Sequence, residues 1–227
     1  MDRKFYARDT ETVARDLLGC ILVRRSNNQP DPAGTSEEQW IGGLIVETEA
    51  YLPGDVDPAS HSVAGRTRRN KSMFGPPGIY YVYQIHTRHC LNVSTSAPGV
   101  GTAVLIRSIQ PIWGIETIAK RRGVAITHRM ADIRRLTSGP GMLCQALSID
   151  LAVDGRDSCQ NRDLQICHRP VLPPFTTIAG PRIGITAAAD LPLRFFVDGN
   201  RYVSGPTSPH TVPRRQSFAI ESRTRVE

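Results

Sequence analysis

The sequence predicts a single domain that combines β-strands with helices. Three observations lead to this prediction: a long β-prone run at 40–51, two strand-like runs at 78–86 and 90–94 that lie close enough to pair as a hairpin, and an amphipathic helical pattern at 112–122. The 227 residues are enough to bury a proper core, and no internal repeat or clear linker divides them.

Around the central run, turn residues and periodicity mark the other elements. A helix is predicted at Thr10–Leu18, with Thr10 as its N-cap and Gly19 as its stop, and a strand follows at Cys20–Arg24. The polar segment Ser26–Glu38 is predicted to be a loop. The later elements are a strand at Thr102–Ser108, a helix at Ile112–Arg122 that ends at Gly123, a helix opened by Thr137-Ser138-Gly139-Pro140 and running through Leu147, and strands at Arg182–Thr186 and Leu193–Val197.

The composition indicates a negatively charged partner. Lysine and arginine total 28 against 21 aspartates and glutamates, which gives a net charge of +7. A basic excess favours a polyanion, and nucleic acid is the commonest one. Most of the positive residues are arginines, whose planar guanidinium groups suit two-point contacts with phosphate.

Cysteine usage and the N-terminus indicate an intracellular protein without a metal site. The five cysteines are odd in number and show no C-x-x-C spacing, so we expect free thiols in a reducing compartment. No apolar run could span a bilayer, and no signal peptide is evident, so no membrane partner is expected. The compartment would be the cytoplasm or nucleoid of a prokaryote, or the nucleus of a eukaryote. We expect a folded domain at 1–204 and a flexible tail at 205–227, which is rich in Pro, Ser, Thr and Arg.

The central run carries two carboxylates on one face. In an extended chain Glu47, Glu49 and Tyr51 point the same way, and Pro53-Gly54 ends the strand just beyond them. A solvated edge face would explain the two glutamates, since charged residues are mostly exposed. The alternative is a site in which Glu47 or Glu49 orders a water or accepts a proton, with Tyr51 as a flat wall for a ring.

Two further segments are candidates for binding an anion. The connection after the central strand holds four basic residues, Arg66, Arg68, Arg69 and Lys71. The Ser138-Gly139-Pro140 turn begins a helix, and the free N–H groups of a first helical turn attract anions. In isolation, a solvated surface and an ordinary helix cap are the simpler explanations of these two segments.

Eight short motifs occur in the order seen in the alkyladenine (3-methyladenine) DNA glycosylases, and the resemblance extends from about Ala14 to Ser204. The motifs are Val46-Glu47-Thr48-Glu49-Ala50-Tyr51, His61-Ser62, Arg69-Asn70 with Met73-Phe74, Tyr81-Val82-Tyr83, Cys90-Leu91-Asn92-Val93, Val104-Leu105-Ile106-Arg107, Ser138-Gly139-Pro140 with Leu143-Cys144-Gln145-Ala146-Leu147, and Arg182-Ile183-Gly184. Each motif alone is weak, whereas eight in order are specific.

The resemblance implies an α+β fold: a single domain with a curved antiparallel β-sheet, surrounding helices and a protruding β-hairpin that enters DNA. It implies an enzyme of base excision repair that flips alkylated or deaminated purines out of double-stranded DNA and hydrolyses the N-glycosidic bond, leaving an abasic site. No lysine stands at the nucleophile's position, so hydrolysis without strand cleavage is expected. A monomer without a cofactor is expected as well.

The resemblance also assigns roles to single residues. Glu49 would be the general base, Arg107 would hold the attacking water, and the Ile183 carbonyl would be the third contact of that water. The pocket for the base would comprise the stacking side chains Tyr51, His61 and Tyr83, and Asn92, which would reject guanine. The phosphate contacts would be Arg66, Arg68, Arg69, Lys71, Ser138 and Gly139.

The sequence departs from the family pattern at the hairpin tip and in two other places. Family members commonly carry a tyrosine where this chain has His86, so the wedge that fills the gap left by the flipped base is His86, Thr87 or Arg88. A lysine that often follows the Ser-Gly-Pro turn is replaced by Met142. The connection between Tyr51 and His61 is also one residue longer than the family pattern.

Two other functions remain as alternatives. A protein of the same fold could bind damaged DNA without catalysis, although the presence of both Glu49 and Arg107 argues against this. A glycoside hydrolase acting on sugars would also use two carboxylates. However, side chains two apart on one strand are only about 7 Å apart and on the same side, and the basic loops would be left unexplained.

Overall fold

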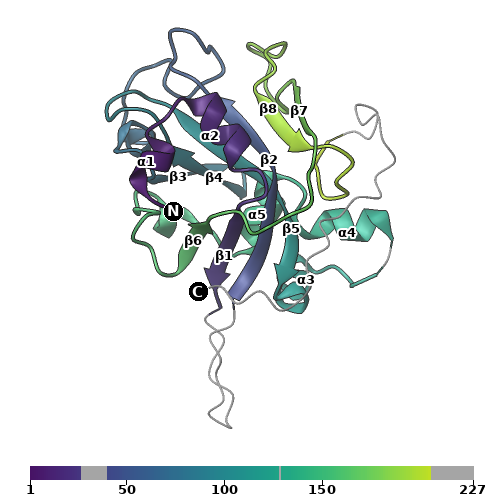
Figure 1. The fold of residues 1–227 in the computed structure, drawn as a ribbon. Coiled ribbons are helices and arrows are strands. Elements are labelled where there is room, and N and C mark those ends of the chain that lie inside the picture. Colours follow the sequence, from purple (N-terminus) through teal and green to yellow (C-terminus); the bar gives the residue numbers. More distant parts are fainter. Residues whose placement is uncertain (27–39, 128, 206–227) are drawn as a thin grey trace.

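The computed structural model describes residues 1–26, 40–127 and 129–205 as one curled antiparallel sheet with helices packed around it (Figure 1). Within this part the strand order is β3-β4-β5-β2-β1-β6, and β8 pairs with both β2 and β7. The strands are β1 (Ile21–Arg25), β2 (Trp40–Tyr51), β3 (Tyr80–Ile85), β4 (Arg88–Ser94), β5 (Ala103–Trp113), β6 (Leu164–Cys167), β7 (Thr177–Gly180) and β8 (Arg194–Val197). The predicted single α+β domain with a curved antiparallel sheet is confirmed. Most of the predicted loop at Ser26–Glu38, and the tail beyond residue 205, lie outside the described residues.

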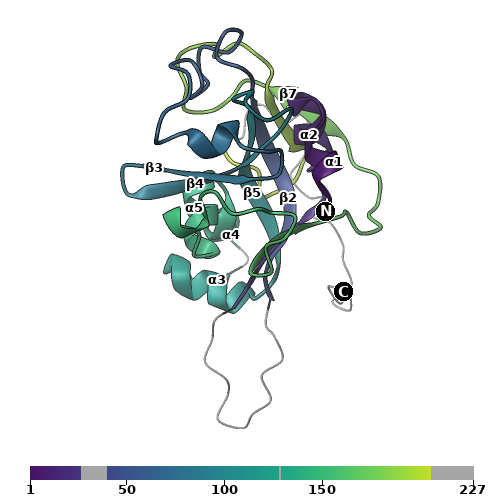
Figure 2. The ribbon, with the colours of Figure 1, turned by 90° about the vertical axis from the view of Figure 1, so that its left-hand side faces the viewer.

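Helices cover both sides of the sheet. In Figure 2, α1 and α2 lie on one side of β2, and α3, α4 and α5 lie on the other. The helices are α1 (Arg3–Tyr6), α2 (Thr10–Asp16), α3 (Ile115–Arg122), α4 (Met130–Thr137) and α5 (Pro140–Ala146), with single 3-10 turns η1 (Lys71–Phe74) and η2 (Leu151–Val153). None of the helices in the described part of the chain has the length and apolar composition needed to cross a bilayer.

Strand β2 is the centre of the sheet and the scaffold of the site. One edge of β2 pairs with β5, whereas the other edge pairs with β1 in its first half and with β8 at Glu47–Glu49. Strands β1 and β5 approach β2 so closely that positions 42 and 43 need glycine. A Cβ at Gly42 would lie 2.0 Å from the carbonyl oxygen of Leu22 in β1, and a Cβ at Gly43 would lie 1.8 Å from that of Gln110 in β5. The pairing with β5 shifts register on both sides of Glu47, and such bulges bend a sheet and redirect its side chains.

Strands β3 and β4 pair from Tyr80–Val93 to Ile85–Arg88, which leaves His86 and Thr87 as the two-residue turn. His86 has φ of 51°, a left-handed conformation that few residues other than glycine adopt. The two strands extend away from the rest of the sheet (Figure 2). Strand β4 begins at Arg88, two residues before the predicted start, because Arg88 and His89 still pair with β3.

Two further predicted boundaries and one predicted strand are wrong. The helix expected at Ile112–Arg122 begins only at Ile115, because β5 continues to Trp113 and Gly114 turns the chain at φ of 65°. Asp9, rather than Thr10, caps α2: its carboxylate accepts from the N–H of Thr12. No strand forms at 182–186, since the Ile183 amide donates to a side chain instead of to a neighbouring strand.

Candidate active site

The described residues enclose a cavity of about 290 Å³ between the base of the β3–β4 hairpin and the end of β2. Cavities of this size, at the lower end of the range for small-molecule sites of roughly 300 Å³ and above, suit a single ring system. The lining residues are Tyr51, Ala59, His61, Met73, Tyr81, Tyr83, Ile85, Cys90, Asn92, Leu105, Arg107, Pro140, Ile183, Gly184 and Ile185. The four predicted pocket residues Tyr51, His61, Tyr83 and Asn92 therefore meet in one place, together with Ile183 and Arg107, which were predicted to contact the water.

One wall of the cavity is a cluster of aromatic rings. The His61 and Tyr83 rings are 4.5 Å apart between centroids at 71°, and His61 Nδ1 lies 2.7 Å from the hydroxyl of Tyr81. Partial burial and the positive charge of Arg69 lower the pKa of His61, so the imidazole is neutral near pH 7. Tyr81 was not among the predicted pocket residues, although the period of two along β3 places it on the same face as Tyr83.

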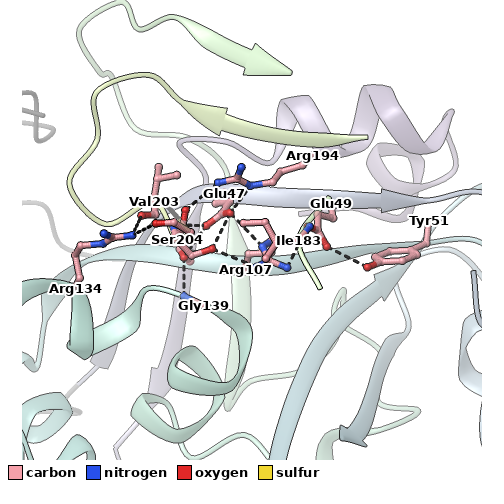
Figure 3. A network of polar contacts seen from close by, with 12 residues as sticks. Glu47, Glu49, Tyr51, Arg107, Arg134, Gly139, Ile183, Arg194, Val203 and Ser204 are labelled. Atoms are coloured by element: carbon pink, nitrogen blue, oxygen red, sulfur yellow. Dashed lines mark hydrogen bonds and ion pairs between the residues drawn. The ribbon is translucent and has the colours of Figure 1, made fainter. Parts of the chain in front are cut away.

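Glu49 lies directly behind the cavity wall. Its side chain is 0 % exposed, and its contacts are the Arg107 Nη1 at 3.1 Å, the Ile183 amide at 2.8 Å and the Tyr51 hydroxyl at 3.0 Å (Figure 3). All three partners line the cavity, whereas Glu49 itself does not. The Ile183 amide therefore orients the carboxylate directly, and the contact of the Ile183 carbonyl with a water stays a prediction.

Glu47 is also fully buried but is committed to a different set of partners. Its Oε1 accepts from Arg107 Nε at 3.1 Å and from Arg194 Nε at 2.6 Å. Its Oε2 accepts from the Ser108 hydroxyl at 2.9 Å and from the Ser204 amide at 2.8 Å. Burial alone would raise the pKa of Glu47, but the two arginines and the Ser204 amide outweigh burial and lower it to about 2. Glu47 is therefore a weak base.

Arg107 connects the two carboxylates. Burial by itself would lower its pKa, but Glu49 and Glu47 raise it, so the guanidinium stays charged. Two glutamates and two arginines, Arg107 and Arg194, balance one another, and all four side chains are buried. The solvated-edge explanation of Glu47 and Glu49 is therefore wrong.

The hairpin and the basic loop lie at the rim of the cavity. His86 and Thr87 are exposed at the tip, but Arg88 lies in β4, and its Nη1 donates to Gln145 on α5 at 2.7 Å. Arg66, Arg68, Arg69 and Lys71 are all exposed. Arg69 Nη2 donates to the Gln84 carbonyl of β3 at 2.8 Å, so this loop runs beside the hairpin.

Gly139 is the N-cap of α5 and Ser138 precedes it, and the phosphate contacts expected of the two residues stay a prediction. The side chain of Ser138 is buried. The Gly139 amide donates to the Ser108 hydroxyl at 2.9 Å and to the Arg107 carbonyl at 3.1 Å. That N–H group is thus already used within the domain, where it supports the two residues that hold Glu47.

Three contributors to the site were missed at the sequence level. Ser204 closes the network around Glu47 from near the end of the described chain, and Arg194 enters it from β8 (Figure 3). Arg182 forms a buried ion pair with Asp57 beside Tyr51. These contacts join residues separated by more than 100 positions, and no local pattern reports them.

Known proteins resemble this chain over most of its length. The sequence model of the Methylpurine-DNA glycosylase family matches residues 4–201. A protein of Rhodopirellula baltica is 48% identical over 220 residues, which cover 96% of this chain and 88% of that protein. A protein of Methanoculleus marisnigri is 47% identical over 204 residues, which cover 88% of this chain and 96% of that protein. Both bear the name "Putative 3-methyladenine DNA glycosylase". The chain therefore belongs to the methylpurine-DNA glycosylase family.

Proposed function

We propose that the cavity receives an alkylated or deaminated purine flipped out of double-stranded DNA, and that Glu49 is the general base for its release. As a member of its family, the chain is a monofunctional DNA glycosylase of base excision repair. The names of its relatives make 3-methyladenine the first substrate to examine. The alternatives of a silent lesion binder and of a sugar-directed hydrolase are set aside on the same ground.

The observation that carries the assignment is the position of Glu49. Its three contacts, Tyr51, Arg107 and Ile183, all face the cavity, so a water entering between them would meet the carboxylate. Glu47, in contrast, accepts from two or more donors at each oxygen and has a pKa lowered to about 2, which makes it a poor proton acceptor.

In the proposed reaction the water oxygen forms a bond to the anomeric carbon of the sugar as the glycosidic C–N bond breaks. Glu49 takes a proton from the water, and the electron pair of the broken bond leaves with the base. A purine made cationic by alkylation leaves as a neutral molecule. The enzyme therefore has to supply little beyond a general base for the water and a negative charge near the sugar. A deaminated purine is neutral and leaves with more difficulty.

The rings that line the cavity supply the binding. Tyr51, His61 and Tyr83 offer flat, electron-rich faces that attract a cationic ring. Asn92 is fixed by a hydrogen bond from its Nδ2 to the Tyr81 carbonyl at 3.0 Å. A rigid side chain in this place would clash with the exocyclic amine of guanine and so exclude that normal base.

The hairpin orients the enzyme on the duplex. We assign His86 and Thr87 to the gap left by the flipped base, because they form the exposed tip, whereas Arg88 is held against α5. The hairpin lies between the connection that carries Arg66–Lys71 and the helices α3 and α5 (Figure 2). On the helical side, Arg88 and Arg122 both donate to Gln145, and no carboxylate of the described residues pairs with them. The two basic flanks fit the two phosphate backbones of one groove.

The remaining assignments concern the whole protein. We propose a monomer that works without a cofactor, in the compartment that holds the genome. Because Ser204 is part of the Glu47 network, residues 1–204 form the proposed catalytic domain, and residues 205–227 form the proposed tail. No membrane partner is proposed.

The test is release of free base from duplexes that each carry one lesion: 3-methyladenine, 7-methylguanine, hypoxanthine or ethenoadenine. The expected result is release of at least one base with an abasic site and an intact strand as the other product. Tight lesion binding without any release would support a silent binder and contradict the proposal.

A further inference from the structure

Arg182 and Asp57 form a fully buried ion pair next to the cavity. The pair is two-pronged, with Arg182 Nη1 2.6 Å from one Asp57 oxygen and Nη2 2.7 Å from the other, and both side chains are 0 % exposed. A buried pair of this kind is often no more stabilising than an apolar pair of the same volume. Its contacts with neighbouring groups therefore give a better account of its role than stability does.

The pair joins the three segments that form one side of the site. Arg182 Nη1 also donates to the carbonyl of Ala50, which lies between Glu49 and Tyr51. Asp57 accepts from the amide of Leu52 at 3.1 Å and from the amide of Ala59 at 3.2 Å, two residues before His61. The next residue after Arg182 is Ile183, whose amide holds Glu49.

The guanidinium of Arg182 also stacks on Tyr51. Its central carbon lies 4.7 Å from the centroid of the ring. Tyr51 lines the cavity, whereas Arg182 does not, so the ring separates the cation from the cavity. Burial is the largest cause of the raised pKa of Tyr51, and the nearby Glu49 carboxylate raises this pKa further. The positive charges of Arg107 and Arg182 act in the opposite direction and lower it. The ring therefore lies within the field of the Arg182 charge.

We propose that Arg182 is a specificity-determining residue that reduces the preference of the pocket for cationic bases. An aromatic ring attracts a cation through the negative charge of its face. A guanidinium on the far side of Tyr51 opposes that attraction and repels a second cation, while it leaves stacking of a neutral base unaffected. The enzyme would then accept neutral deaminated purines beside cationic alkylated ones. This inference rests on the proposed function, in which the flipped base stacks on Tyr51.

The test removes the buried charges as a pair, in the variant Asp57→Asn/Arg182→Gln, which keeps polar side chains of similar shape. Single-turnover release is measured for 3-methyladenine, which is cationic in DNA and lacks the exocyclic amine of guanine, and for hypoxanthine, which is neutral, in the same duplex sequence. The ratio of the two rates is expected to rise about threefold to tenfold, as for the strengthening of one cation–π contact. An unchanged ratio in the folded variant would overturn the proposal.

Two controls separate charge from position. Arg182→Lys keeps a cation behind Tyr51 but loses the two-pronged contact, so its ratio should stay within about twofold of the wild type even if both rates fall. Arg15→Gln removes a guanidinium stacked on Phe195 at 4.2 Å, away from the cavity, and should leave the ratio unchanged. A ratio that rises as much in Arg182→Lys as in the double variant would also overturn the charge mechanism.

Two further variants keep the result interpretable. If the double variant does not fold, Asp57→Leu/Arg182→Met replaces the pair with apolar side chains of similar volume and carries the same expectation. Tyr51→Leu tests the proposed function itself. If Tyr51→Leu leaves every rate unchanged, stacking on Tyr51 fails as a premise. If Tyr51→Leu slows release but the double variants of Asp57 and Arg182 leave the ratio of the two rates unchanged, only the role of Arg182 fails.

Discussion

Arg107 contacts Glu47 and Glu49 through different atoms of its guanidinium: Nε lies 3.1 Å from Glu47 Oε1, and Nη1 lies 3.1 Å from Glu49 Oε1. Ser204 and Arg194 complete the shell around Glu47 from distant parts of the chain. The two glutamates of β2 thus have different tasks. Glu47 fixes the arginine, and Glu49 is left as the carboxylate nearest the cavity.

Replacing Glu47 should weaken the fold and change its response to acid. Glu47→Gln leaves Arg107 and Arg194 without their shared partner, and breaking a buried pair costs about 3–5 kcal/mol of unfolding free energy. Because the folded pKa is lowered to about 2, ionised Glu47 stabilises the protein above its unfolded pKa, and this contribution of about 3 kcal/mol is lost as the pH falls from about 4.5 to about 2. Urea unfolding of wild type and Glu47→Gln at pH 7, 4.5 and 3 measures this. The variant should lose less stability over that interval, and equal losses would contradict the role of Glu47.

The hairpin tip should affect base flipping more than chemistry. His86→Ala removes the side chain proposed to fill the gap, so release should slow most for well-paired hypoxanthine and least for hypoxanthine in a mismatch, which flips readily. Because His86 has φ of 51°, alanine also strains the turn, whereas His86→Gly removes the ring without that strain. Single-turnover release by both variants, and by His86→Tyr, separates the two effects. His86→Ala and His86→Gly should both release the paired lesion more slowly than the wild type, and His86→Tyr should release it at least as fast as the wild type. Equal rates for all these proteins would exclude His86 as the wedge.

The two basic flanks of the hairpin should contribute separately to the salt dependence of DNA binding. Each phosphate contact contributes about 0.9 to the slope of log affinity against log salt concentration. Arg68→Gln/Arg69→Gln and Arg88→Gln/Arg122→Gln should each reduce the slope by up to about 1.8, and the four-residue combination by the sum. The control is Arg15→Gln/Arg169→Gln, whose side chains pack on Phe195 and Phe175 away from the hairpin. A flank whose loss leaves the slope at the control value does not contact DNA.

The sequence predicted the parts of this protein that depend on local patterns. The period of two along β2 correctly placed Glu47, Glu49 and Tyr51 on one face, and the family motifs correctly predicted the α+β fold. It could not predict that Ser204 and Arg194 would enclose Glu47, because those contacts arise only when the chain closes on itself. The missing strand at 182–186 has the same origin: the Ile183 amide bonds to Glu49 rather than to a neighbouring strand. Tyr81 could have been found, since it alternates with Tyr83 along β3.

The assignment of the general base is tested most directly by comparing Glu49→Gln with the wild type in two assays, single-turnover release of base and equilibrium binding to a lesion-containing duplex. Glutamine keeps the size of the side chain but cannot accept the proton, so release should fall by about 10²–10⁴-fold while binding stays within about twofold. Glu47→Gln, measured in parallel and at a temperature where it is folded, should retain more activity. The account is contradicted if Glu49→Gln releases the base at the wild-type rate while Glu47→Gln is inactive.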